Sequence, residues 1–313
     1  MPWFRRNGSA IGAPRSQAST QSGFWDLNDA HQLKQLNTWG DTSFPVSNPQ
    51  LQWVMSAQEG PSSFPSGSAN SVDLSENFPQ AYSGNWYTNT ALSKNSYTNS
   101  SSITRYYYPI PNTSNLRTAS NTSGNSDLIS NGGYTFYISF IPDTNTTTWA
   151  RLFNYYGLAA GSSTTSVGNT DEYKGPLLFV NEGTNRFEYR KPSSGSSNGD
   201  TSNPGGTSLT YSSNNVFNLV IQQNSDETGY CWIRNQNRTT GSVSNSFNNS
   251  SITFSGTAGY GIRSGTNTGI PVFADNYYST NTFTGIMESG FANRPYTSTE
   301  CYNLVEHLST KYA

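Results

Sequence analysis

The segment "NVFNLVIQQNSDETGYCWIRNQ", residues 215–236, carries the pattern that decides the fold. Residues 215–223 and 229–236 are rich in branched aliphatic and aromatic side chains, which favour strands. Between them, residues 224–228 have the polar composition of a turn. The segment therefore predicts a β-hairpin.

Short runs of the same character occur on both sides of this hairpin. The run "YTFYISFI" (134–141) alternates as a strand does, and "TWARLFNYYG" (148–157) follows it. The stretch "GPLLFVNEGTNRFEYR" (175–190) indicates a second hairpin that turns at residues 182–185. Three further strands are expected at "SITFSG" (251–256), "IPVFAD" (270–275) and "FTGIMESGF" (283–291). Short strands without intervening helices predict an all-β fold, a β-sandwich or jelly roll.

The end of the chain has a helical pattern instead. Thr297 and Glu300 have the spacing of a capping box. The apolar positions that follow recur at i, i+3, i+4 and i+7, and they are Cys301, Leu304, Val305 and Leu308. The sequence therefore predicts a short amphipathic helix over 298–311 that plugs or flanks the sandwich.

The N-terminal region differs from the rest. Residues 1–22 are rich in Gly, Pro, Ser and Gln, as in an extended arm. Residues 23–40 are expected to hold a short anchoring helix over 26–38, which Gly40 would end. A helix of about three turns is not stable alone, so its apolar side must pack either on the chain's own β domain or on another subunit.

Residues 41–132 are predicted as a linker with the first strands, and residues 133–313 as the jelly-roll domain. The run "LQWVM" (51–55) is a strand or an irregular linker. In "ITRYYYPIP" (103–111) three successive tyrosines cannot all face one side of a strand, so at least one is exposed or makes an intersubunit contact.

Composition limits the partners. Charged residues make up 12% of the 313 residues and the net charge is −2, so no basic field for nucleic acid exists. No apolar run is long enough for a membrane span. The 20 Tyr, 16 Phe and 7 Trp residues indicate an ordered aromatic core, not disorder. For the two cysteines, Cys231 and Cys301, two buried free thiols are the favoured interpretation, and a disulfide between them is the alternative.

The order of these elements resembles that of concanavalin A-like, laminin-G-type jelly rolls. The resemblance runs from "YTFYISFI" through the two hairpins to "FTGIMESGFANRPYTSTECYNLVEHLSTKY", a final strand that leads into a short helix. It covers residues 133–313 and implies the jelly-roll fold. Because many unrelated functions share this fold, the resemblance implies little about activity.

A second resemblance lies in "GFWDLNDAHQLKQLNTWG" (23–40), which is similar to the start of many structural proteins of tailed bacteriophages, marine phages in particular. It implies a virion protein on the particle surface: a head decoration protein or fibre, or a neck or tail appendage. Its partners would be other virion proteins, copies of itself and host surface glycans. The residues expected to anchor it are Trp3, Phe4, Phe24, Trp25, Leu27, Leu33, Leu36 and Trp39.

The alternative is a secreted or cell-surface lectin-like module. Glycan sites use aromatic rings that stack on sugars, together with polar side chains that bond to hydroxyl groups. The tyrosines that could supply such rings are Tyr106, Tyr107, Tyr108, Tyr155, Tyr156, Tyr277 and Tyr278.

Catalysis and metal binding are not favoured. The paired carboxylates of jelly-roll glycoside hydrolases need alternate positions on one strand, and no acidic residues here show that spacing. His31 and His307 lie in helical patterns without a nucleophile motif. No catalytic residue and no cofactor is therefore expected. A calcium ion at the sandwich rim is an option, with Asp171–Glu172 or Asp275–Asn276 as ligands.

Overall fold

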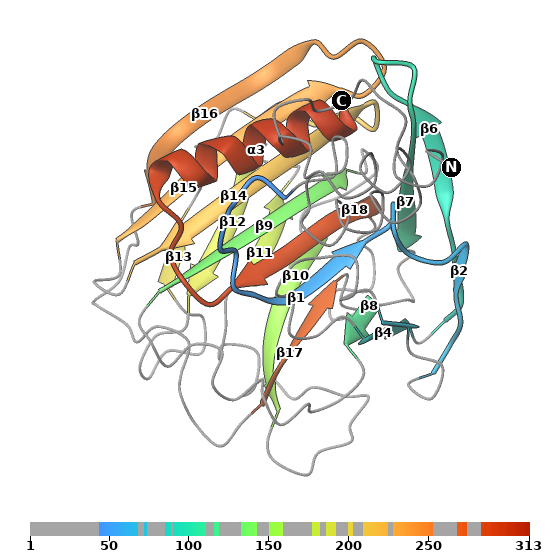
Figure 1. Ribbon diagram of the computed structural model, residues 1–313, viewed down its shortest axis with the longest axis horizontal. Coiled ribbons are helices and arrows are strands. Elements are labelled where there is room, and N and C mark those ends of the chain that lie inside the picture. The colour runs from blue at the N-terminus through green and yellow to red at the C-terminus, as the bar shows by residue number, and fades with distance from the viewer. Residues whose placement is uncertain are drawn as a thin grey trace, which may run out of the picture. The chain divides into compact units, whose positions relative to one another are not determined.

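The structure is a computed structural model (Figure 1). It describes residues 44–67, 72–73, 85–88, 90–110, 116–118, 133–142, 150–158, 177–181, 186–191, 200–202, 209–224, 228–252, 268–273 and 283–313. The chain divides into two compact units, Met1–Ser47 and Asn48–Ala313. The fold below is that of the second unit. The predicted arm and helix at residues 1–40, with all eight anchoring residues, lie outside the described residues.

The first large sheet is antiparallel. Its strand order is β16-β15-β14-β9-β18-β7-β6, and β1 also pairs with β18. The bounds are β1 Leu51–Ser56, β6 Asn95–Thr98, β7 Thr104–Ile110, β9 Tyr134–Ile141, β14 Asn215–Gln223, β15 Gly229–Asn237, β16 Val243–Ile252 and β18 Phe283–Ala292. Strands from residues 41–132 thus join the same sheet as strands from residues 133–313.

The second large sheet is antiparallel too, in the order β13-β12-β11-β10-β17-β8-β4-β3. The bounds are β3 Val72–Asp73, β4 Asn85–Thr88, β8 Leu116–Thr118, β10 Ala150–Leu158, β11 Leu177–Asn181, β12 Arg186–Lys191, β13 Asp200–Ser202 and β17 Thr268–Phe273. Strands β2 (Ser63–Phe64) and β5 (Leu92–Ser93) form a separate pair. The described part of the chain is therefore mostly antiparallel β-sheet, an arrangement compatible with the expected β-sandwich.

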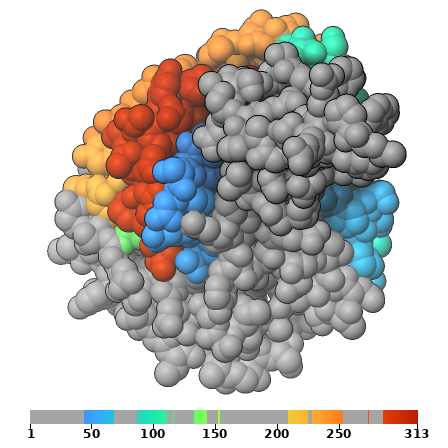
Figure 2. All heavy atoms as spheres, viewed as in Figure 1, coloured from blue at the N-terminus to red at the C-terminus, as the bar shows by residue number. Residues whose placement is uncertain are grey.

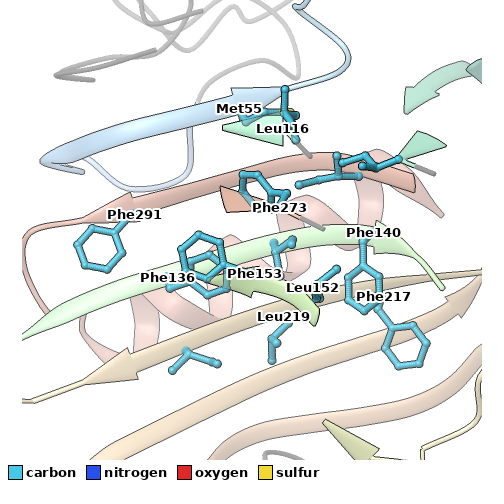
Figure 3. Packing of buried hydrophobic residues seen from close by; sticks show 14 of the residues in the cluster. Met55, Leu116, Phe136, Phe140, Leu152, Phe153, Phe217, Leu219, Phe273 and Phe291 are labelled. Carbon is cyan, nitrogen blue, oxygen red and sulfur yellow. The ribbon is translucent and has the colours of Figure 1, made fainter. Parts of the chain in front are cut away.

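Aromatic side chains fill the space between the two large sheets (Figure 3). Phe136 of β9 stacks on Phe153 of β10 with ring centroids 4.5 Å apart. Trp53 of β1 lies 5.6 Å from Phe153 and 5.9 Å from Phe273 of β17. These contacts join β1 to the opposite sheet, so the run at 51–55 is a core strand.

One helix, α3 (Ser298–Tyr312), packs on the outer face of the first sheet against β14, β15 and β16 (Figure 1). The prediction of a flanking helix at 298–311 is confirmed, and all four predicted apolar residues are buried. The helix covers β14, which is buried at every position, on both faces. Within the described residues no helix is long and apolar enough to cross a membrane.

Other local predictions had mixed outcomes. Both hairpins are confirmed, since β14 pairs with β15 and β11 with β12. The strand expected at 251–256 begins earlier than predicted, because β16 covers Val243–Ile252, and residues 253–256 lie outside the described residues. Most of β16 is polar and exposed, so it lacks the apolar alternation that marks a strand in a sequence. Cys231 and Cys301 are buried thiols that are not joined in a disulfide, as expected.

Candidate functional site

At the N-terminal end of α3, a capping box and an ion pair bind the charged side chains. Thr297 and Glu300 form the predicted capping box. Arg294 donates to both carboxylate oxygens of Glu300, at 2.9 and 2.6 Å. These bonds lower the pKa of Glu300 to about 2. Every charge named here has a partner, so this end of the helix is a structural joint.

A second ion pair joins the middle of α3 to the first sheet. The Nε of Arg234, on β15, donates to Glu306 at 2.7 Å. Its other nitrogens donate to the carbonyls of Ile233 and Phe247 and to the side chain of Asn248. Arg234 is nearly buried, and a buried cation is stable only when it is paired in this way.

A third ion pair lies under the C-terminal end of α3. Glu288 of β18 is 1% exposed, and it accepts from Lys311 Nζ and from the Tyr312 hydroxyl, each at 2.6 Å. Burial alone would raise the pKa of Glu288, but the ammonium of Lys311 and the two hydrogen bonds outweigh burial and keep that pKa below its usual value. Glu288 is therefore a charged carboxylate fixed between sheet and helix.

Two hairpin turns from distant parts of the first sheet meet at this same end of the helix. In the β6–β7 turn, Asn99 and Ser100 donate to the carbonyls of Lys311 and Ala313, at 3.3 and 2.9 Å. In the β15–β16 turn, Gly241 has φ +71° and approaches so closely that a Cβ would lie 3.1 Å from Ser100 Oγ. The first sheet is thus curled, and Figure 2 shows the two turns in contact at the surface.

Two tyrosines and two arginines gather where these turns meet, and we call them the tyrosine–arginine cluster: Tyr97, Arg105, Tyr107 and Arg238. Tyr97 of β6 pairs directly with Arg105 of β7, so their side chains share a face. Tyr107, two residues further on, lies on the same face, with its ring centroid 6.4 Å from that of Tyr97. The guanidinium of Arg238, in the β15–β16 turn, lies 5.1 Å from the centroid of the Tyr97 ring.

The backbone around the cluster fixes its tyrosines. The Tyr97 hydroxyl donates to the carbonyl of Tyr312, and burial raises its pKa despite Arg238 and Arg105, which lower it. A Cβ on Gly285 of β18 would lie 2.3 Å from Tyr107 Cδ2, so only glycine allows that ring to lie against the strand. Both rings are thus held in place and remain partly exposed.

The two arginines of the cluster lack the carboxylate partners that the three cations along α3 have. The Nε of Arg105 and one terminal nitrogen of Arg238 are buried without a hydrogen-bond partner. Among the described residues no carboxylate pairs with either guanidinium. These two buried atoms are closed to a ligand, but the other nitrogens of both guanidinium groups also bond to no described residue. They are the donors that a ligand could satisfy.

The structure separates the three successive tyrosines predicted at a glycan site. Tyr108 is fully buried, packs on Phe64 and donates to the carbonyl of Pro61 at 2.5 Å, so it is a core residue. Tyr106 packs at the rim of the core under Lys94, whose Nζ is 4.9 Å from the ring centroid. Tyr107 belongs to the cluster on the opposite face. The expectation that at least one of the three is exposed is met only in part, since both Tyr106 and Tyr107 are half-buried.

The other predicted residues cannot be placed. Tyr155 and Tyr156 are on β10, but their side chains are not described, and Tyr277 and Tyr278 lie outside the described residues. Both predicted calcium sites, at 171–172 and 275–276, also lie outside them. The described residues contain no group of His, Cys, Asp and Glu that could hold a metal ion.

Sequence reasoning missed three of the four cluster residues, namely Tyr97, Arg105 and Arg238. Arg105 and Tyr107 at i and i+2 of one predicted strand give a weak signal, because alternate residues share a face. Tyr97 could be found only from the β6–β7 pairing. Arg238 joins the cluster only because the sheet curls, which no local pattern reveals.

No protein-family model and no curated protein matches the chain. Among solved structures, the receptor-binding domain of botulinum neurotoxin mosaic serotype C/D is 13% identical, with a TM-score of 0.40 over 80% of this chain and 51% of that one. The binding domain of botulinum neurotoxin DC in complex with SialylT is 12% identical, with a TM-score of 0.43 over 76% and 50%.

A sialidase of Trypanosoma rangeli is 11% identical, with a TM-score of 0.35 over 69% of this chain and 27% of that one. The chain thus spans about half, or less, of the length of these structures. At such TM-scores the matches do not identify a function, which is inferred below from the side chains of the cluster.

Proposed function

We propose that residues 48–313 form a non-catalytic, lectin-like module with a jelly-roll β-sandwich, which binds carbohydrate at the tyrosine–arginine cluster. One observation carries the proposal: fixed, partly exposed tyrosine rings lie beside two guanidinium groups that bond to no described acceptor. Sugar sites combine these two features, a ring for the apolar face of the sugar and donors for its oxygens.

The described carboxylates favour binding over hydrolysis. Glu288, Glu300 and Glu306 each bind a cation of the protein itself, and the three lie along the whole length of α3. A retaining or inverting glycosidase instead needs two carboxyl groups within about 5–9.5 Å, facing one sugar. A lectin needs no such pair of carboxyl groups.

Binding of the full-length chain to a glycan array tests this proposal, with variant Tyr107→Leu and control Tyr302→Leu. Tyr302 is 44% exposed on α3, outside the cluster. Selective binding that falls about tenfold in Tyr107→Leu, and stays unchanged in the control, is expected because loss of ring stacking costs about 1 kcal/mol or more. An array without selective binding, or equal effects of the two variants, contradicts the proposal.

A place on a virion is a second proposal, and it would give such a module a role in host adhesion. Its main support is the resemblance of residues 23–40, and the division of the chain at residue 47 is consistent with a separable anchor. Deletion of residues 1–40 should then abolish incorporation into particles while the sandwich stays folded. Incorporation of the truncated chain, or its unfolding, would contradict the anchoring role.

A further inference from the structure

We propose that the tyrosine–arginine cluster selects acidic saccharides, those that carry a carboxylate or sulfate group, over their neutral parents. This inference rests on the proposed carbohydrate site and adds the class of ligand. Its basis is the difference between the arginines of the cluster and the three cations along α3.

Three cations along α3 have a carboxylate of their own. Arg294 binds Glu300, Arg234 binds Glu306 and Lys311 binds Glu288. In each pair the nitrogen and oxygen lie in direct contact, and the charge of the cation is neutralised within the protein.

Arg105 and Arg238 have no such carboxylate in the described part of the chain. Both lie close enough to Tyr97 to lower its pKa, so two positive charges act at one place. Glu288, under the same end of the helix, is already bound to Lys311 and Tyr312. The cluster therefore has an excess of positive charge although the whole chain has a net charge of −2.

Guanidinium groups match planar or tetrahedral oxyanions. Arginine presents several N–H donors in a fixed fork, and carboxylate or sulfate oxygens accept them in pairs. A neutral sugar hydroxyl would satisfy a donor but would leave the charges unbalanced. An acidic group on the sugar would satisfy the donor and also balance the charge.

The cluster also fixes the position of the acidic group relative to the ring. Arg238 lies over the Tyr97 ring. Arg105 shares a face of the sheet with Tyr97, its neighbour across the ladder, and with Tyr107, two residues on. A sugar ring stacked on Tyr107 would thus hold a substituent beside Arg105. This geometry suits a saccharide more than a free inorganic anion, which would make no use of the tyrosine rings.

The test is an array on which sialylated, uronic-acid and sulfated oligosaccharides stand beside their neutral parents, probed with the full-length chain. We expect the acidic forms to bind about tenfold or more tightly than the parents, because their oxyanions form charge-assisted hydrogen bonds with the guanidinium groups. Their binding should weaken as sodium chloride is added.

Two variants locate the preference. In Arg105→Gln and in Arg238→Gln, affinity for the acidic forms should fall about tenfold while affinity for neutral parents is kept. The control Lys94→Gln removes one positive charge from the opposite face of the same hairpin and should leave both affinities unchanged.

The outcomes separate the two proposals. Neutral parents that bind as tightly as the acidic forms overturn this inference and leave the carbohydrate site standing. Acidic preference that survives both arginine variants also overturns it. No binding to any saccharide, acidic or neutral, overturns both proposals. Inhibition by sodium sulfate alone, without preference among saccharides, shows an anion site and overturns the inference as stated.

Discussion

The two ends of α3 use the same kinds of residue in opposite ways. At the N-terminal end, Arg294 is bound on both nitrogens by Glu300 and lies over the Tyr296 ring, 4.5 Å from its centroid. At the C-terminal end, Arg238 lies over Tyr97 in the same manner but has no carboxylate among the described residues. The first arrangement completes a structural joint. The second leaves N–H donors of the guanidinium without an acceptor, which is why we place the ligand there.

The same contrast distinguishes two groups of residues at the C-terminal end of α3, a lower one beneath the helix and an upper one around the turns. Glu288, Lys311 and Tyr312 form a satisfied network beneath the helix. The tyrosine–arginine cluster lies above it, around the hairpin turns. Substitutions in the lower group should change stability, and those in the upper group should change binding.

The largest expected effect is that of Glu288→Gln. Removal of one partner from a buried ion pair leaves Lys311 uncompensated and should lower the free energy of unfolding by about 3 kcal/mol. Urea denaturation measures this loss. The control Glu59→Gln changes an exposed carboxylate and should stay within about 0.5 kcal/mol. A Glu288→Gln protein as stable as the control would show that the pair does not hold the helix.

At the other end of α3, acid should remove the contribution of Glu300. Its pKa is lowered from 4.5 to about 2, so the stabilisation is complete above pH 4.5 and is lost as pH falls toward 2. Because this pair is partly exposed to solvent, with side chains 22% exposed, we expect a loss of only about 1 kcal/mol.

Urea midpoints measured across that pH range test this prediction. Glu300→Gln should remove this part of the acid dependence, whereas Glu59→Gln should keep it. If the two variants gave the same pH profile, the bond from Arg294 would not be the source of the stabilisation.

The smallest effect on stability is expected in the cluster itself. Arg105→Gln and Arg238→Gln, the variants expected to lose binding, should change the free energy of unfolding by less than about 0.5 kcal/mol or raise it, since an unpaired donor is removed. Arg294→Gln, which breaks a satisfied pair, should cost about 1 kcal/mol. Equal losses in all three would mean that the cluster arginines are structural, and the contrast between the helix ends would fail.

Prediction from the sequence succeeded where one short segment contains the whole signal. The hairpin at 215–236 and the helix at 298–311 were found because strand alternation and the capping box are local patterns. The strand β16 was misplaced because its side chains are polar and mostly exposed. The β1 strand at 51–55 stayed ambiguous, since its role depends on Trp53 reaching rings of the opposite sheet.

The site was predicted less well for a related physical reason. Tyr107 was named, but with Tyr106 and Tyr108, which the alternation of β7 turns to the other face. Tyr97 and Arg238 become neighbours only through the curl of the first sheet. Pairing of distant strands sets this geometry, so no window of sequence can contain it.

The two thiols lie in different layers, and this makes them built-in reporters. Cys231 belongs to the core between the sheets, whereas Cys301 lies on the buried face of α3, on the other side of the first sheet. Alkylation of Cys301 would record detachment of the helix, and alkylation of Cys231 would record separation of the sheets. Mass spectrometry of partly labelled protein could therefore show whether the outer layer peels away before the sandwich opens, without any engineered label.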